Sequence, residues 1–194
     1  MKRQTKKQQR YTTRDRMLEA SLAVFIEAGT LDLSLDRLAA TIESSKRMLI
    51  HYFGGKKPLE RAVMVRLEES LRAQFRADSF PPGTSLPEVL ATLWQRTTHP
   101  KARGVLLLTM DLTRRAWSGS KRAKEFYEKQ WRIWINLLLE FSPDGTLVES
   151  ALQLFQGAML TYLVTGDREN GRRTLERFFL NSGRTNRGSN DQTS

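Results

Sequence analysis

Cysteine is absent from this 194-residue sequence, which excludes disulfide bonds, thiolate metal sites and a cysteine nucleophile. Histidine is nearly absent as well, because the chain contains only His51 and His99, which lie far apart in the sequence. We find no glycine-rich phosphate loop and no other nucleophile motif. The sequence therefore predicts a protein that is not an enzyme and that binds neither a metal nor a cofactor.

Long apolar runs are also missing. No uninterrupted apolar stretch approaches the roughly 18 residues that a membrane span requires, and the basic N-terminus has no apolar stretch behind it that would make it a signal peptide. Hydrophobic residues still make up 39% of the chain, with four Trp and nine Phe, which is enough for a core. We therefore expect a cytoplasmic protein without a membrane partner.

Negative charge is scarce at the N-terminus. The chain carries a net charge of +11, and within residues 1–16 seven basic side chains face Asp15 alone, which gives this segment a net charge of +6. We expect residues 1–11 to form a disordered basic arm. Such an arm suits a phosphate backbone, but an anionic lipid surface or simple solubility explains it equally well. The charge alone leaves the partner open.

The hydrophobic pattern is helical throughout and predicts an all-α fold of about nine helices. Helix-capping residues divide the chain, and the sequence "SFPPGTSLPE" (79–88) interrupts it most strongly. Thr146 and Glu149 resemble a capping box for a long helix that runs to about Thr165. The last helix is expected over about 170–180, and residues 182–194 have the composition of a disordered tail.

Two short helices near the N-terminus form a helix-turn-helix pattern. The second begins after Ser45 and ends at Gly54–Gly55, and its Leu49 and Phe53 lie four residues apart, on the side that faces the core. Lys46 and Arg47 lie at its N-terminal end, where the helix dipole and free N–H groups favour a phosphate. A solvated helix start without a ligand is the alternative for these two residues.

The stretch "LSLDRLAATIESSKRMLIHYFGGKKPLERAV" (33–63) resembles the N-terminal signature of the TetR family, the tetracycline-repressor-like regulators. The match covers about residues 12–65 and implies a helix-turn-helix DNA-binding domain over 12–57. It also implies a helical effector-binding and dimerisation domain over 58–181. The function implied is that of a repressor, which a small molecule releases from a near-palindromic operator.

Motif and resemblance together predict which residues contact DNA. The predicted contacts are Arg14, Ser34, Arg37, Ser45, Lys46, Arg47, Met48, His51, Tyr52 and Lys56. For Tyr52, half-buried packing is an equal alternative. The sequence departs from the family pattern at Ile50, which replaces a tyrosine, and at Glu43, which replaces a turn glycine and is not expected to adopt a positive φ freely.

Aromatic and amide side chains in the C-terminal part suggest a pocket for a hydrophobic or aromatic effector. The candidates are Trp94, Met110, Trp117, Tyr127, Trp131, Gln153 and Gln156. Aromatic residues at helical spacing are more often core than ligand contacts, so core packing is the alternative for each of them.

The last two helices carry more apolar surface than a short chain needs, and the resemblance implies that they form a four-helix homodimer interface. The predicted interface residues are Leu152, Phe155, Met159, Leu163, Leu175, Phe178 and Phe179. An intramolecular core is the alternative. For the whole protein, two other functions stay open, namely a non-specific binder of nucleic acid or anionic surfaces and a small helical enzyme.

Overall fold

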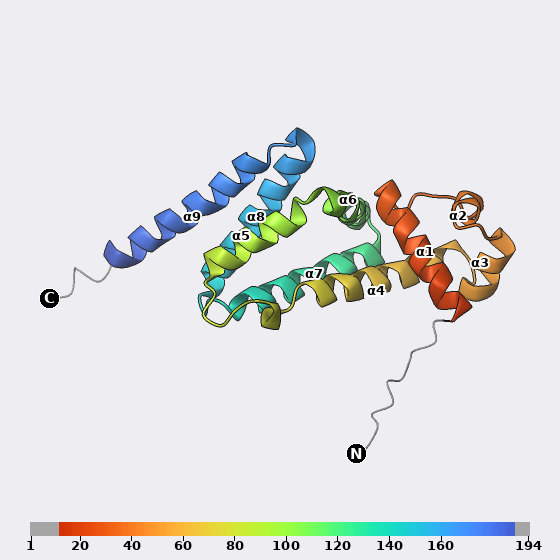
Figure 1. Cartoon of the computed structure of the whole chain (residues 1–194), viewed down its shortest axis with the longest axis horizontal. Coiled ribbons are helices and arrows are strands. Elements are labelled where there is room, and N and C mark those ends of the chain that lie inside the picture. Colours follow the sequence, from red (N-terminus) through yellow and green to blue (C-terminus); the bar gives the residue numbers. More distant parts are fainter. Residues whose placement is uncertain (1–11, 189–194) are drawn as a thin grey trace, which may run out of the picture.

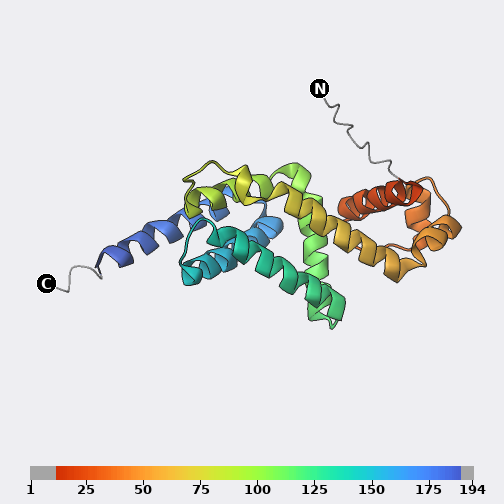
Figure 2. The same cartoon turned by 90° about the horizontal axis from the view of Figure 1, so that it is seen from below.

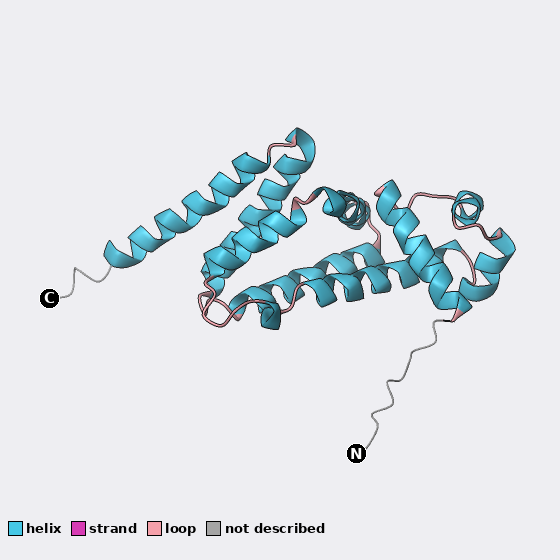
Figure 3. Cartoon of the chain, viewed as in Figure 1, coloured by secondary structure: helices cyan, strands magenta, loops and turns pink. Residues whose placement is uncertain are grey.

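The computed structural model describes residues 12–188, and this part of the chain is helical with no strand (Figure 3). Two 3₁₀ turns, η1 (Ala77–Ser79) and η2 (Pro100–Ala102), flank the fifth helix. The nine α-helices are α1 (Thr13–Ala28), α2 (Leu35–Thr41), α3 (Lys46–Phe53), α4 (Lys56–Gln74), α5 (Leu86–Thr97), α6 (Arg103–Trp117), α7 (Lys121–Leu139), α8 (Gly145–Thr165) and α9 (Arg168–Gly188). The predicted all-α fold with about nine helices is confirmed. The predicted basic arm, residues 1–11, lies outside the described residues.

Side-chain caps begin most of these helices, as the sequence predicts. Thr12 and Asp15 form a capping box at α1, and Ser34 and Ser45 accept hydrogen bonds from backbone N–H groups of α2 and α3. The prediction for α8 was wrong, because Asp144 caps it by accepting a hydrogen bond from the N–H of Leu147 at 3.0 Å. Asp144 directly precedes the first residue of α8, which is the position of a capping residue, whereas Thr146 already lies inside the helix.

The last helix is longer than predicted. It begins at Arg168 and continues to Gly188, so residues 182–188 are helical although their composition is that of a tail. Much of α9 packs against α8 and α5. The C-terminal end of α9 and the helix-turn-helix unit of α2 and α3 lie at opposite ends of the molecule (Figures 1 and 2).

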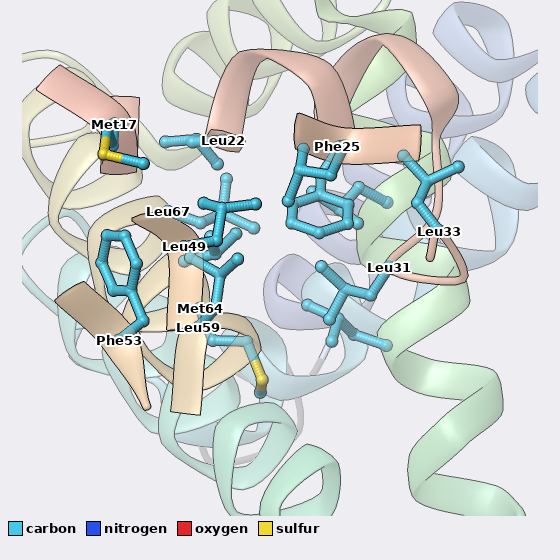
Figure 4. Packing of buried hydrophobic residues seen from close by; sticks show 14 of the residues in the cluster. Met17, Leu22, Phe25, Leu31, Leu33, Leu49, Phe53, Leu59, Met64 and Leu67 are labelled. Atoms are coloured by element: carbon cyan, nitrogen blue, oxygen red, sulfur yellow. The ribbon is translucent and has the colours of Figure 1, made fainter. Parts of the chain in front are cut away.

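The first hydrophobic core joins α1 to α4. Its buried members include Phe25 and Leu49 (Figure 4). Leu38 of α2 belongs to the same cluster, so these side chains hold α2 and α3 against α1 and α4. Leu108 and Leu112 of α6 belong to the same cluster. The DNA-binding unit predicted over residues 12–57 therefore rests directly on α6.

The second core lies between α5, α6, α7, α8 and α9. Helix α8 is long and apolar enough to cross a membrane by length and composition, which the search for uninterrupted apolar runs did not reveal. In the structure its buried residues, among them Val148 and Ala151, form part of this core. Helix α8 is thus a core helix, although other apolar side chains on it face outward.

Candidate DNA-binding face and ligand cavity

The turn between α2 and α3 contains Glu43, the one non-glycine residue with positive φ in the described part of the chain, with φ of 52°. Glu43 therefore adopts the positive φ that the sequence analysis expected to be unfavourable for a residue with a Cβ atom. The N–H groups of Glu43 and Ser44 donate to the carbonyl oxygens of Ala40 and Ala39 at 3.3 and 2.9 Å, respectively. These hydrogen bonds close the C-terminal end of α2 and hold the backbone in a conformation that glycine usually adopts.

Helix α3 has one buried side and one exposed side. Leu49 and Phe53 are buried among side chains of α1 and α4, in agreement with the predicted orientation (Figure 4). Arg47, Ile50 and His51 are consequently exposed, with 44% of the Ile50 side chain accessible. The exposed side offers a guanidinium, an imidazole and apolar groups together.

Tyr52 is half-buried and packs against the first core, with its ring edge-on to His51 at a centroid distance of 5.0 Å. The packing expected for Tyr52 is therefore present in the structure, and its contact with DNA stays a prediction. Met48 is exposed beside the N-terminal turn of α3. Ser45 caps α3 by accepting a hydrogen bond from the N–H of Met48 at 3.2 Å, and Ser34 accepts one from Arg37 at 3.1 Å.

The cationic side chains on α3 and at the start of α4 differ in their ion-pair partners. Lys46 makes a 2.9 Å ion pair with Asp36, and both side chains are exposed. Lys56 lies 3.9 Å from Asp32 and 3.8 Å from Glu60. Exposed ion pairs of this kind contribute about 0–1 kcal/mol, so a phosphate can displace the carboxylates at small cost.

Arg47 and Lys57 are exposed, and no described residue forms an ion pair or a hydrogen bond with their side chains. Arg14 lies over the ring of Phe53 at 5.0 Å from its centroid, which brings the start of α1 to the end of α3. Sequence reasoning singled out Lys56 and missed Lys57, although its position in the first turn of α4 was a signal. The predicted DNA contacts thus come from the starts of α1, α2 and α4 and from α3.

A cavity of about 1130 Å³ lies in the C-terminal part of the molecule, between α4, α5, α6, α7 and α8. Five of the seven predicted pocket residues line it, namely Met110, Tyr127, Trp131, Gln153 and Gln156. Trp134 and Phe75 contribute further aromatic surface, with ring centroids 5.0 Å apart.

Trp94 and Trp117 do not line this cavity, so their prediction was wrong. Trp94 is buried in the second core, where its Nε1 donates to the carbonyl of Arg168 at 3.2 Å and its ring lies against Gly171. Trp117 ends α6 and is 89% exposed. The sequence shows that both residues are aromatic but not where their rings point. The packing of α5 on α9 determines the position of Trp94, and the end of α6 that of Trp117.

Sequence reasoning missed Gln130, which lines the cavity from α7. Its Nε2 is buried and has no hydrogen-bond partner among the described residues. Tyr127 lies one turn earlier and donates from its hydroxyl to Oε1 of Gln156 at 3.4 Å. The spacing of three between Tyr127 and Gln130 places both on one side of a helix and was the available signal.

The residues predicted for the dimer interface differ in their burial within one chain, and the interface itself stays a prediction. Leu152, Phe155, Met159 and Leu175 are buried in the second core of a single chain, and Leu163, Phe178 and Phe179 are partly buried against it. These residues occupy the intramolecular core that was the alternative. The apolar side chains that face outward on α8 and α9 are Leu160, Val164 and Leu180.

Asp111 of α6 connects the cavity region to the helix-turn-helix unit. Its Oδ2 accepts hydrogen bonds from Thr30 Oγ1 and from the N–H of Leu31, both at 3.1 Å. Burial raises the pKa of Asp111, but hydrogen bonds from Arg114, Arg115 and Leu31 outweigh this effect, so its pKa lies below the ordinary value for aspartate. Asp111 is therefore ionised at neutral pH and holds α6 to the segment that follows α1.

No family model matches the chain. The known proteins to which it is similar are transcriptional regulators. The HTH-type transcriptional repressor NicS of Pseudomonas putida is 31% identical over 98 residues, which are 48% of this chain. The chain spans about half the length of this curated relative, because the match covers 46% of it.

Solved structures of similar fold cover most of the chain. A TetR-family transcriptional regulator from Streptomyces coelicolor superposes with a TM-score of 0.70 and 19% identity, over 85% of this chain and 78% of that one. A putative TetR-family transcriptional regulator from Rhodococcus sp. superposes with a TM-score of 0.67 and 16% identity, over 85% of this chain and 95% of that chain. A TetR-like transcriptional regulator from Rhodococcus sp. RHA1 superposes with a TM-score of 0.54 and 26% identity, over 85% of this chain and 92% of that chain.

Proposed function

We propose, since the chain belongs by its fold to the TetR family of transcriptional regulators, that it is a sequence-specific DNA-binding repressor controlled by a small molecule. The observation that carries the proposal is the two-sided character of α3. Its apolar side is anchored by Leu49 and Phe53, and its other side exposes Arg47, Ile50 and His51. A helix that enters the major groove needs this combination of a fixed position and free polar groups.

In this proposal Arg47 contacts base edges, because a guanidinium can donate two hydrogen bonds to guanine. Ile50 and Met48 supply apolar contacts of the kind that a thymine methyl group accepts. Lys46, Lys56 and Arg37 lie around this helix and bind phosphates, as does Arg14 at the start of α1. Ser34 and Ser45 contribute by fixing the starts of α2 and α3.

Operator recognition requires two copies of the helix-turn-helix unit. We propose that two chains pair through the outward-facing residues of α8 and α9, with Leu160, Val164 and Leu180 in the contact. A symmetric pair would place two copies of α3 at successive major grooves, about one helical turn apart, on a near-palindromic operator. Residues 12–57 then bind DNA, and residues 58–181 bind the effector and the second chain.

An effector in the cavity would act through α6. This helix lines the cavity with Val105, Thr109 and Met110, and it holds the helix-turn-helix unit through Leu108 and Asp111. A ligand that binds one position of α6 better than another shifts the population between two spacings of the recognition helices. Release from DNA follows when the favoured spacing no longer fits the operator. The protein would act in the cytoplasm, where its DNA lies.

Selection from random duplex DNA tests this function directly. Purified full-length protein is incubated with the pool at near-physiological salt, and the bound DNA is sequenced. A two-fold-symmetric enriched motif is the expected result. Without any enriched sequence, the proposed specificity is wrong and the non-specific alternative takes its place, in which the basic N-terminus supplies the affinity.

Deleting residues 1–10 separates the two functions further. A sequence-specific protein loses affinity but keeps its preference for the enriched motif. A binder driven by the basic arm loses nearly all binding, because counterion release from phosphates supplies almost all of its free energy.

A further inference from the structure

The wall of the cavity carries an uneven set of charges. Arg96 and Lys101 line it, while no aspartate or glutamate is found among its described lining residues. The rest of the wall is mainly apolar, with Trp131 and Trp134 as the largest side chains. A cationic ligand would find no carboxylate to replace its lost hydration. An anionic group would find the charges of two exposed side chains, Lys101 and Arg96, of which Arg96 also lies over the ring of Phe80 at 5.4 Å from its centroid.

Most of the oxygen-bearing groups in the wall already have partners. The hydroxyls of Thr109 and Thr113 donate to carbonyl oxygens of their own helix at 2.8 and 3.0 Å, and Tyr127 donates to Gln156. The Nδ1 atom of His99 accepts a hydrogen bond from the N–H of Lys101 at 3.2 Å. The hydroxyl of Thr97 and the amide nitrogen of Gln130 are among the donors in the wall for which no partner is found among the described residues.

Gln130 Nε2 is the donor that most strongly indicates a ligand with an acceptor group, because it is buried without a partner. A buried polar group without a hydrogen bond costs about 1–3 kcal/mol, and a ligand that supplies an acceptor recovers this cost. At about 1130 Å³ the cavity slightly exceeds the usual range of ligand pockets, about 300–1000 Å³, so it has room for a drug-sized molecule.

We propose that the cavity binds a mainly apolar molecule with a carboxylate head group, whose oxygen accepts the hydrogen bond from Gln130 while Arg96 and Lys101 balance its charge. The apolar part of the ligand packs against Trp131 and Trp134. This inference names the effector class of the proposed function and rests on it only in taking the cavity as the effector site.

Three probes of equal chain length test the head group, namely decanoate, decan-1-ol and decylammonium, each kept below its aggregation or solubility limit. Binding to the full-length protein is measured by isothermal titration calorimetry without DNA. We expect one decanoate per chain, bound at least about tenfold more tightly than decylammonium, with decan-1-ol between them. Decylammonium binding as tightly as decanoate, or no binding by decanoate, overturns the proposal.

Two variants locate the binding. Gln130→Leu is expected to weaken decanoate about tenfold, the loss of one hydrogen bond to a charged acceptor, and to leave decylammonium unchanged because an ammonium group accepts no hydrogen bond. Lys101→Ala should also weaken decanoate. Lys121→Ala is the matched control, because it also removes one positive charge from the net charge of +11, but Lys121 is exposed and does not line the cavity. An equal loss for all three probes in Gln130→Leu, or an equal loss of decanoate binding in Lys121→Ala and Lys101→Ala, contradicts the proposal.

The two proposals fail separately. If decanoate binds as expected but no operator is enriched, the DNA-binding function is wrong and the ligand class stands. If an operator is enriched but decylammonium is preferred, only the ligand class is wrong.

Discussion

The backbone at Glu43 has a φ of 52° in the turn between α2 and α3. A residue with a Cβ atom pays about 1–2 kcal/mol for a left-handed conformation, whereas glycine adopts it freely. The side chain of Glu43 is exposed, and no hydrogen bond or ion pair from it is found among the described residues. The strain therefore has no visible compensation within one chain.

Glu43→Gly is expected to raise the free energy of unfolding by about 1 kcal/mol, as measured by urea denaturation, because relief of strain exceeds the added freedom of the unfolded chain. Glu43→Ala keeps the Cβ atom and should change stability by less than about 0.5 kcal/mol. A lower stability for Glu43→Gly would show that the turn does not carry this strain.

Arg47 and Lys57 are both exposed, and we expect them to make different contacts with DNA: Arg47 of α3 contacts base edges, and Lys57 in the first turn of α4 binds a phosphate. Arg47→Ala should cost about 1–3 kcal/mol with the selected operator and relax the preference at one base pair. Lys57→Ala should weaken operator and scrambled DNA alike and reduce the slope of log affinity against log salt by about 1. Both effects are measured by fluorescence anisotropy at several salt concentrations. Identical behaviour of the two variants contradicts the assignment.

Helix α6 is the element that touches both the cavity and the DNA-binding unit. Gly104 lets it approach α1 closely, because a Cβ atom there would lie 2.3 Å from the carbonyl oxygen of Ile26. About two turns beyond Gly104 on the same helix, Asp111 accepts hydrogen bonds from Thr30 and Leu31. The segment after α1 is thus fixed to α6 by one close backbone contact and one ionised side chain.

Asp111→Asn is expected to lower the free energy of unfolding by about 2 kcal/mol, since the ionised side chain is mostly buried and accepts hydrogen bonds from two arginines and a backbone N–H. The pKa of Asp111 is lowered in the folded state, so its stabilisation is complete above the unfolded pKa of about 3.9 and is lost as the pH falls through the lower folded value. The difference between wild type and variant should therefore be constant from about pH 5 to 8 and shrink below about pH 4.

Asp78→Asn is the control for this variant. Asp78 pairs with Arg76 on the surface at 2.6 Å, and both side chains are exposed, so the substitution should cost less than about 1 kcal/mol. Equal losses for Asp78→Asn and Asp111→Asn would contradict the special role of Asp111.

Local sequence signals predicted the helices well, because caps and stops act within one turn. Ser34, Ser45 and Gly54 begin or end elements where the sequence places them. The orientation of α3 was equally predictable, since Leu49 and Phe53 lie four residues apart and can bury only one side. These features depend on neighbours in the chain.

Features that depend on distant packing were not predictable. The apolar residues of α8 surround much of the helix, so the sequence did not distinguish Phe155, which faces the core, from Val164, which faces outward. Trp94 was displaced from the cavity by its packing against Gly171, a residue of α9. Gln130 gained its importance only because the packing around α7 buries its amide nitrogen without supplying a partner.

The molecule as a whole leaves an apolar strip on the outside of α8 and α9. Val164 is 79% exposed and Leu160 is 55% exposed in the single chain. Val164→Glu is expected to leave the fold intact, to convert the proposed dimer into a monomer and to abolish operator binding, because a charge in an apolar interface is costly. Molar mass from size-exclusion chromatography with light scattering measures the change.

Val65→Glu on α4 is the matched control, because Val65 is also apolar and is 52% exposed. It should leave the molar mass unchanged. A Val164→Glu variant that remains dimeric would mean that the two chains pair through another surface.

The central claim is sequence-specific recognition of DNA, and one titration tests it most directly. The affinity of the full-length protein for the selected operator is compared with its affinity for a scrambled duplex of equal length at about 0.15 M salt. The account predicts a ratio of at least about 10³, as is typical of specific DNA-binding proteins. Equal affinities that fall together with rising salt would contradict it and leave only the attraction between a basic protein and phosphates.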